Sequence, residues 1–172
     1  MTTALLRASA TAAAPARVLA GCGSPNGATR YRVDGDSMAP ALKAGTTVTA
    51  QPVPKSGYAA KRGDIVVFHA PLSWPGGKAD VRIKRVVGLG GETVACCDDQ
   101  GRVAVNGAGL PEPYVGENAP LDRTVHCGGR RFGEVRVPAD QLFVLGDSRA
   151  VSVDSACNGP IPASSVIAVV AA

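Results

Sequence analysis

The sequence predicts a mostly β fold with few short helices, and three observations support this. From residue 31 onward, short runs rich in β-branched and apolar residues alternate with stretches rich in glycine and proline. No stretch keeps the apolar period of a helix for three turns. The pairs Gln100-Gly101 and Asn106-Gly107 are typical of turns that flank a strand. The predicted strands are 46–50, 64–68, 81–89, 92–95, 102–106, 134–137, 142–145 and 166–170.

Residues 1–30 are expected to form a leader or linker. They are rich in Ala, Thr and Gly, and contain no apolar run near the ~20 residues that a bilayer-spanning helix needs. A transmembrane helix is therefore not expected here. The run Leu19-Ala20-Gly21-Cys22 has the form of a lipoprotein processing site, so a lipid anchor at Cys22 is one interpretation. A disordered leader, a truncated anchor or a wrongly assigned start is favoured over it.

A candidate nucleophile, Ser37, lies in the stretch 33–42. Gly35 lets another chain approach closely because it has no Cβ, and Pro40 stiffens the backbone just after the serine. The alternative is a turn in which Asp and Ser side chains cap local backbone groups. This stretch alone therefore does not distinguish a nucleophile from a structural turn, and other parts of the chain must support a catalytic role for Ser37.

A candidate general base, Lys84, lies in the β-branched run 81–89. A lysine can act as a base only when burial or nearby positive charge lowers its pKa, and the apolar neighbours together with Arg82 and Arg85 offer both. A third stretch, 146–155, follows an apolar strand and is dense in hydroxyl and carboxylate groups. Such a loop is suited to orienting a lysine.

Together these three stretches resemble the type I signal peptidases, serine endopeptidases that remove signal peptides with a Ser/Lys pair. The resemblance also includes 62–68 and the segment 105–114, which contains Glu112-Pro113-Tyr114. One short motif would be weak evidence, but several motifs in the family's order and approximate spacing make a specific signal.

The resemblance implies a coiled, antiparallel-rich and barrel-like β fold. The catalytic domain is expected over 31–172, with a variable insertion around 96–136 that lies away from the chemistry. The resemblance also implies that Ser37 attacks the substrate and Lys84 takes its proton. The backbone N–H of Ser37 is expected to hold the oxyanion with a second backbone donor near Gly35, where some relatives carry a serine hydroxyl.

Supporting roles follow from the same resemblance. Ser152 matches the family serine that hydrogen-bonds the lysine, and Asp154 matches a structural acid behind it. Asp147 is expected to pair with Arg85. An alanine stands two residues after Asp154, where family members often carry arginine, so Arg149 is the candidate partner of Asp154.

The implied substrate is a signal peptide of an exported protein, docked as an extended strand with small residues one and three positions before the cleaved bond. The residues expected to form the pocket walls are Val33, Met38, Val81 and Ile83. No cofactor is expected. We expect a monomer that works at the outer face of the cytoplasmic membrane, next to the membrane surface.

The five cysteines show no C-x-x-C spacing, so no metal is predicted. A disulfide from the Cys96-Cys97 pair to Cys127 and free buried thiols are equally favoured; the pairing of Cys157 stays open. The formal charge of +4 is too diffuse to indicate nucleic acid as a partner.

Three alternative functions stay open. A Ser-His-Asp triad with His69 or His126 ranks low, because neither histidine lies in a motif. A self-cleaving repressor type of Ser/Lys peptidase would need a DNA-binding domain or an internal cleavage loop, and neither is visible. A non-catalytic extracytoplasmic β-domain lipoprotein is typically marked by loss of the serine or the lysine, and both are present.

Overall fold

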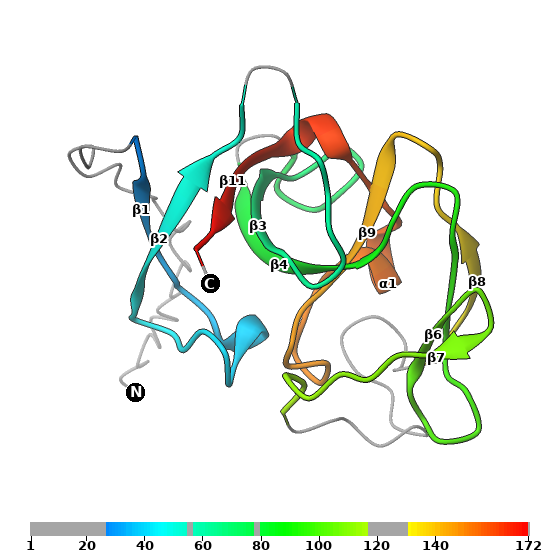
Figure 1. Cartoon of the computed structure of the whole chain (residues 1–172). Helices are drawn as coiled ribbons and strands as arrows, with labels where there is room; N and C mark the ends of the chain where they lie inside the picture. The colour runs from blue at the N-terminus through cyan, green and yellow to red at the C-terminus, as the bar shows by residue number, and fades with distance from the viewer. Residues whose placement is uncertain (1–26, 55–56, 78–79, 117–130, 172) are drawn as a thin grey trace, which may run out of the picture.

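The computed structural model describes residues 27–54, 57–77, 80–116 and 131–171, which fold into two antiparallel sheets (Figure 1). The larger sheet has the order β1 (Thr29–Arg32), β2 (Thr47–Pro52), β11 (Val166–Val170), β3 (Ile65–His69), β4 (Val81–Gly88), β9 (Gln141–Leu145) and β10 (Ile161–Pro162). The smaller sheet has the order β7 (Ala108–Gly109), β6 (Val103–Val105), β5 (Thr93–Cys96) and β8 (Phe132–Arg136). The short helices are η1 (Asp36–Met38), α1 (Ser155–Asn158) and η3 (Ala163–Ser165).

The predicted fold class is confirmed, and each of the eight predicted strands is present within one or two residues of its expected ends. The sheets coil but do not close into a barrel, because β1 and β10 are the free edges of the larger one. Three strands were not predicted. β1 is short and polar and begins before residue 31, while β7 and β10 have only two residues each. Such short edge strands carry too few residues to show a period of two.

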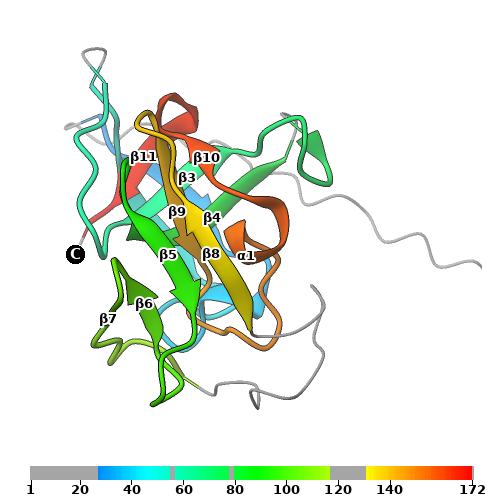
Figure 2. The ribbon, with the colours of Figure 1, turned by 90° about the vertical axis from the view of Figure 1, so that its right-hand side faces the viewer.

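One core joins the two sheets. Phe143 and Leu145 of β9 pack with Val94 and Val105 of the smaller sheet, which lies in front of β9 in Figure 2. Burying each large apolar side chain stabilises the fold by about 1.5–3 kcal/mol. At the crossing, Gly88 leaves no space for a side chain, because a Cβ there would lie 2.4 Å from Val94. Packing therefore fixes how the smaller sheet sits on β4.

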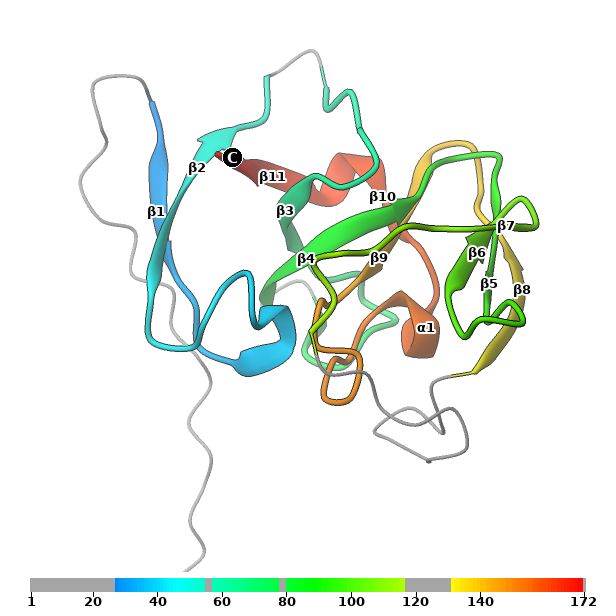
Figure 3. The same cartoon turned by 60° about the horizontal axis from the view of Figure 1, so that its bottom comes forward.

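The pairing of β4 leaves part of one edge open. β3 pairs with β4 from Val81 to Arg85, whereas β9 pairs with β4 only from Arg85 onward. Among the residues that the structure describes, no strand pairs with the second edge of the first half of β4. Figure 3 shows η1 near this half of the strand.

The loop after β3 contributes to the core, and a disulfide lies at the end of β5. Trp74 is 2% exposed and packs edge-on against Phe68, so its ring belongs to the core, whereas Leu72 in the same loop is 76% exposed. The alternative of a disulfide from Cys96 or Cys97 to Cys127 is wrong, because these adjacent cysteines are bonded to each other. Cys127 itself lies outside the described residues.

Three of the four strands of the smaller sheet, β6, β7 and β8, come from the region where an insertion around 96–136 was predicted. Whether that region varies stays a prediction, as do the leader over 1–30 and the lipid anchor at Cys22, which lie almost wholly outside the described residues. Within the described ranges, no helix has the length and apolar character to cross a membrane.

Candidate active site

Ser37 lies in the short helix η1, which is held by the burial of Met38 and by a backbone hydrogen bond to the loop 146–154. Gly35 precedes it in an extended conformation, and the side chain of Met38 is fully buried just after it. The carbonyl of Ser37 accepts a hydrogen bond from the backbone N–H of Ser148 at 3.0 Å. The serine is therefore fixed to the loop 146–154 as well as to its own turn.

Lys84 points at Ser37 from the neighbouring strand β4. Its Nζ donates to the Ser37 Oγ at 2.8 Å and to the carbonyl of Ile83 at 3.0 Å. The side chain is only 5% exposed, because Lys84 lies opposite Val66 and shares a sheet face with Val86, and both are fully buried. The strand thus carries the amine into the core cluster at the point where η1 contacts it.

Burial lowers the pKa of Lys84 to about 8. Asp154 is the strongest opposing influence, and the positive charge of Arg82 lowers the pKa further. Arg85 was expected to contribute too, but it lies one residue on, so its side chain points to the opposite face of β4. There it forms a two-fold ion pair with Asp147.

The expected pair of Asp147 and Arg85 is confirmed. The Arg85 guanidinium donates to both carboxylate oxygens of Asp147 at 2.8 and 2.6 Å, and also to the carbonyl of Gly63 at 2.8 Å. Asp147 is completely buried, so this two-fold pairing compensates its charge.

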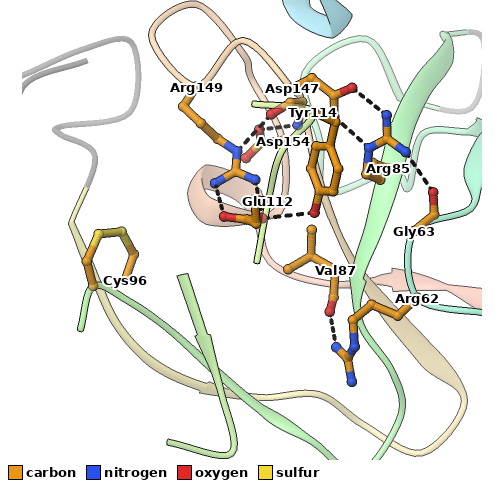
Figure 4. A network of polar contacts seen from close by, with 12 residues as sticks. Arg62, Gly63, Arg85, Val87, Cys96, Glu112, Tyr114, Asp147, Arg149 and Asp154 are labelled. Carbon is orange, nitrogen blue, oxygen red and sulfur yellow. Dashed lines mark hydrogen bonds and ion pairs between the residues drawn. A yellow bond between two sulfur atoms is a disulfide. The ribbon is translucent and has the colours of Figure 1, made fainter. Parts of the chain in front are cut away.

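The expected pair of Asp154 and Arg149 is wrong. Asp154 accepts hydrogen bonds from the backbone N–H groups of Gly146 and Ala156 at 3.0 Å, and so caps the helix α1. Arg149 instead binds Glu112 (Figure 4). Asp154 needs no arginine because backbone donors already satisfy its carboxylate.

The expected hydrogen bond from Ser152 to Lys84 is not formed. The Ser152 Oγ is buried and has no hydrogen-bond partner. It lies beside Gly146, where a Cβ would be 2.3 Å from the Ser152 Oγ and 2.4 Å from the Ser37 carbonyl oxygen. The backbone of Gly146 thus fills the space between Ser152 and the turn that carries Ser37.

Ser37 and Lys84 line an open groove of about 340 Å³. Its other lining residues are Val33, Gly35, Met38, Val81, Arg82, Ile83, Val151 and Val153. All four predicted wall residues are among them. Val151 and Val153 were not predicted, because the many hydroxyl and carboxylate groups of their loop indicated only a role in orienting the lysine.

Neither histidine can be assigned to this site. His69 lines a different pocket, with Pro71, Pro162 and Ile167, and His126 lies outside the described residues. No group of three or more His, Cys, Asp or Glu side chains in the described ranges is arranged to hold a metal ion. The groove is lined by a serine hydroxyl beside a buried amine.

Sequence reasoning missed the buried contacts of Glu112 and Tyr114, which Figure 4 shows beside Arg149 and Arg85. The Glu112-Pro113-Tyr114 motif was noted, but no partner for it could be named. Glu112 and Arg149 are 37 positions apart, and nothing in either stretch indicates that they meet.

Comparison with known proteins agrees with this geometry. The family model described as "Signal peptidase, peptidase S26" matches residues 6–172. Signal peptidase I of Mycobacterium tuberculosis (strain ATCC 25618 / H37Rv) is 31% identical over 164 residues, covering 76% of this chain and 55% of that protein. Signal peptidase I V of Bacillus subtilis (strain 168) is 33% identical over 145 residues, covering 81% of this chain and 82% of that protein.

A solved structure of a signal peptidase I from Enterococcus faecalis V583 matches with a TM-score of 0.50 and 29% identity, covering 66% of this chain and 98% of that one. This chain spans about half the length of the mycobacterial relatives that it matches. The family model covers nearly all of the chain, and both of the relatives named above exceed 30% identity. The chain therefore belongs to the signal peptidase family, peptidase S26.

Proposed function

We propose that this protein is a serine endopeptidase that cleaves signal peptides from exported proteins with a Ser/Lys dyad. The observation that carries the proposal is the 2.8 Å contact between the Lys84 Nζ and the Ser37 Oγ, two residues that line an open groove. A nucleophile within hydrogen-bond reach of a base is the arrangement that covalent acyl transfer requires. Membership of the signal peptidase family supports the same activity.

Neutral Lys84 accepts the proton of Ser37 while the Oγ attacks the carbonyl carbon of the substrate. The C–N bond then breaks as Lys84 passes this proton to the leaving amine, which leaves an acyl ester on Ser37. Water attacks the ester, Lys84 takes its proton, and that proton returns to the Ser37 oxygen as it leaves. A pKa of about 8 allows part of Lys84 to be neutral near neutral pH.

The oxyanion is held by the backbone N–H of Ser37 and by a backbone donor near Gly35. The cleaved segment lies extended along the open edge of β4, so that main-chain pairing supplies affinity. The apolar walls at Val33, Met38 and Ile83 leave room for small side chains near the cleaved bond. Substrates with a bulky residue directly before that bond are then excluded by the walls.

We place the protein at the outer face of the cytoplasmic membrane, because the cleavage site of an exported protein emerges there. Its partners are the signal peptides and the membrane surface, and it acts as a monomer without nucleic acid or cofactor. Asp147, Arg85, Asp154 and Ser152 support the dyad without touching substrate.

The test is cleavage of a synthetic signal-peptide substrate by the wild-type chain and by Ser37→Ala and Lys84→Ala. Each variant is expected to lose activity by several orders of magnitude, because nucleophile and base act as one unit. Thermal unfolding of the variants checks that the fold is intact. Loss of activity in His69→Ala together with full activity in Lys84→Ala would refute the dyad.

A further inference from the structure

The segment 110–116 connects the smaller sheet to the candidate active site. It follows β7, lies below β4 in the view of Figure 1, and runs toward the loop 146–154. Its last described residue, Gly116, lies against the ring of Pro40, where a Cβ would be 2.8 Å from the Pro40 Cδ. The segment therefore contacts the turn of the nucleophile as well as the loop behind it.

Glu112 holds that loop through Arg149. The Arg149 guanidinium donates to the two oxygens of Glu112 at 2.6 and 3.2 Å, and its Nε donates to the carbonyl of Gly146 at 2.9 Å. The two side chains are 9% and 8% exposed, so water does little to screen this pair. Removing one partner would leave the other charge buried and uncompensated.

Tyr114 covers the ion pair of Arg85 and Asp147, which lies in the same cluster. Its hydroxyl donates to Glu112 at 3.0 Å, and the Arg85 guanidinium lies 4.0 Å from the centre of its ring. Such a contact between a cation and a ring is attractive, and it is stronger where water is excluded. Figure 4 shows how the ring stands between Glu112 and Arg85.

Both ion pairs are connected to the segments that carry Ser37 and Lys84. Gly146 and Ser148 belong to the loop that Arg149 holds, and Ser148 donates its N–H to the carbonyl of Ser37. Arg85 directly follows Lys84 in β4, and its pairing with Asp147 ties that strand to the same loop.

We propose that Glu112 and Tyr114 are positioning residues, which hold Ser37 and Lys84 at reacting distance by clamping the loop 146–149. This inference rests on the proposed peptidase function. Neither residue lines the groove, so the clamp acts on the rate of the chemical step rather than on substrate binding. A misplacement of reacting groups by ~1 Å can cost about 10²-fold in rate.

The test compares Glu112→Gln and Tyr114→Phe with the wild-type chain. Glu112→Gln keeps the shape and removes the charge, while Tyr114→Phe removes only the hydroxyl that binds Glu112. We expect kcat to fall about tenfold in Glu112→Gln and less in Tyr114→Phe, with KM within about twofold of wild type. In the double variant Glu112→Gln/Arg149→Gln, the fall in log kcat should be much smaller than the sum of the falls in the two single variants.

Glu92→Gln is the matched control. Glu92 pairs with Arg62 at 2.6 Å and also accepts the N–H of Leu89, but this pair lies away from the groove. Its loss is expected to lower the Tm without changing kcat. The Tm of each variant shows whether a fall in kcat accompanies general destabilisation.

A second measurement does not depend on cleavage. The ¹³C shift of the Lys84 Cε, followed against pH, reports the pKa of this lysine in each variant. Loosening the clamp admits water, so Glu112→Gln should raise the pKa of Lys84 from about 8 toward its ordinary 10.5, whereas Glu92→Gln should not.

The outcomes separate the two proposals. If the wild-type chain cleaves no signal peptide but Glu112→Gln still raises the pKa of Lys84, the peptidase function is wrong and the clamp stands. If the wild-type chain cleaves and both variants keep its kcat and its Lys84 pKa, the function stands and the clamp is wrong. A rise in KM alone would also overturn the clamp.

Discussion

Gly146 and Ser152 are packed so closely that the glycine cannot carry a side chain: a Cβ would lie 2.3 Å from the Ser152 Oγ. The same Cβ would lie 2.4 Å from the carbonyl oxygen of Ser37. One of these contacts is with backbone, which cannot move aside as the end of a long side chain can. The loop 146–154 and η1 are therefore in contact through a position that only glycine fits.

We expect Gly146→Ala to separate the loop from η1, and so to lengthen the contact between Ser37 and Lys84. Overpacking typically costs about 1–3 kcal/mol of stability. The lower stability reduces the fraction of folded protein at 25 °C, and the fall in kcat should be larger than this reduction alone would cause. Gly133→Ala is the control, because a Cβ at Gly133 meets nothing within 4 Å. Full activity in Gly146→Ala would show that the dyad tolerates displacement of this loop.

The pH dependence of the rate tests the protonation state of the base. Only neutral Lys84 can accept the proton of Ser37, and burial lowers the pKa of Lys84 to about 8. We therefore expect kcat/KM to rise with pH and to level off above about 8. Measurement from pH 5 to 10 in constant ionic strength gives the midpoint. An ascending limb centred near the ~6.5 of an ordinary histidine would assign the base to another residue.

The same burial makes Lys84 costly for stability. Its pKa is about 8 in the folded protein and about 10.5 when unfolded, so the unfolded chain binds more protons between these values. The free energy of unfolding should therefore rise as the pH increases from 8 to 10.5. Below pH 8, the buried lysine lowers the free energy of unfolding by the full amount. Lys84→Met should be more stable than wild type at pH 7 by about 3 kcal/mol, and this advantage should shrink toward pH 10.5. Urea unfolding at pH 7, 9 and 10.5 measures it. A constant difference would mean that Lys84 is not buried as a neutral amine.

The strands could be predicted because each is a short run rich in β-branched or other apolar residues, with glycine or proline nearby. Lys84 could be singled out because a lysine inside such a run must be buried or paired. The partner of Asp154 could not be predicted in the same way. Its carboxylate caps α1, a helix of four residues that is too short to show a helical period. Arg149 was thereby free to pair with Glu112, and this contact depends on how the smaller sheet packs, which local sequence does not encode.

Ser152 is expected to contribute to activity at the expense of stability. Its buried hydroxyl lacks a hydrogen-bond partner, which costs about 1–3 kcal/mol. A buried polar group without a partner calls for an explanation, and a catalytic role is one such explanation. Ser152→Ala should leave the Tm unchanged or raise it by a few degrees, while kcat falls and KM stays the same. A raised KM with unchanged kcat would assign Ser152 to substrate binding instead.

Gly35 offers a position at which the oxyanion site can be strengthened. Its backbone is extended, with φ of −149°, and a Cβ there meets nothing within 4 Å. It lines the groove together with Ser37, so a serine at this position would place a hydroxyl close to the developing oxyanion. Removing one oxyanion donor from a protease typically costs about 10²–10³-fold in kcat. An added donor with a freely rotating hydroxyl should give less than this, so we expect Gly35→Ser to raise kcat several-fold with little change in KM. Gly35→Ala is the control, because it adds the same Cβ without the hydroxyl and should keep the wild-type kcat. Equal rates in the two variants would mean that backbone donors already saturate the oxyanion site.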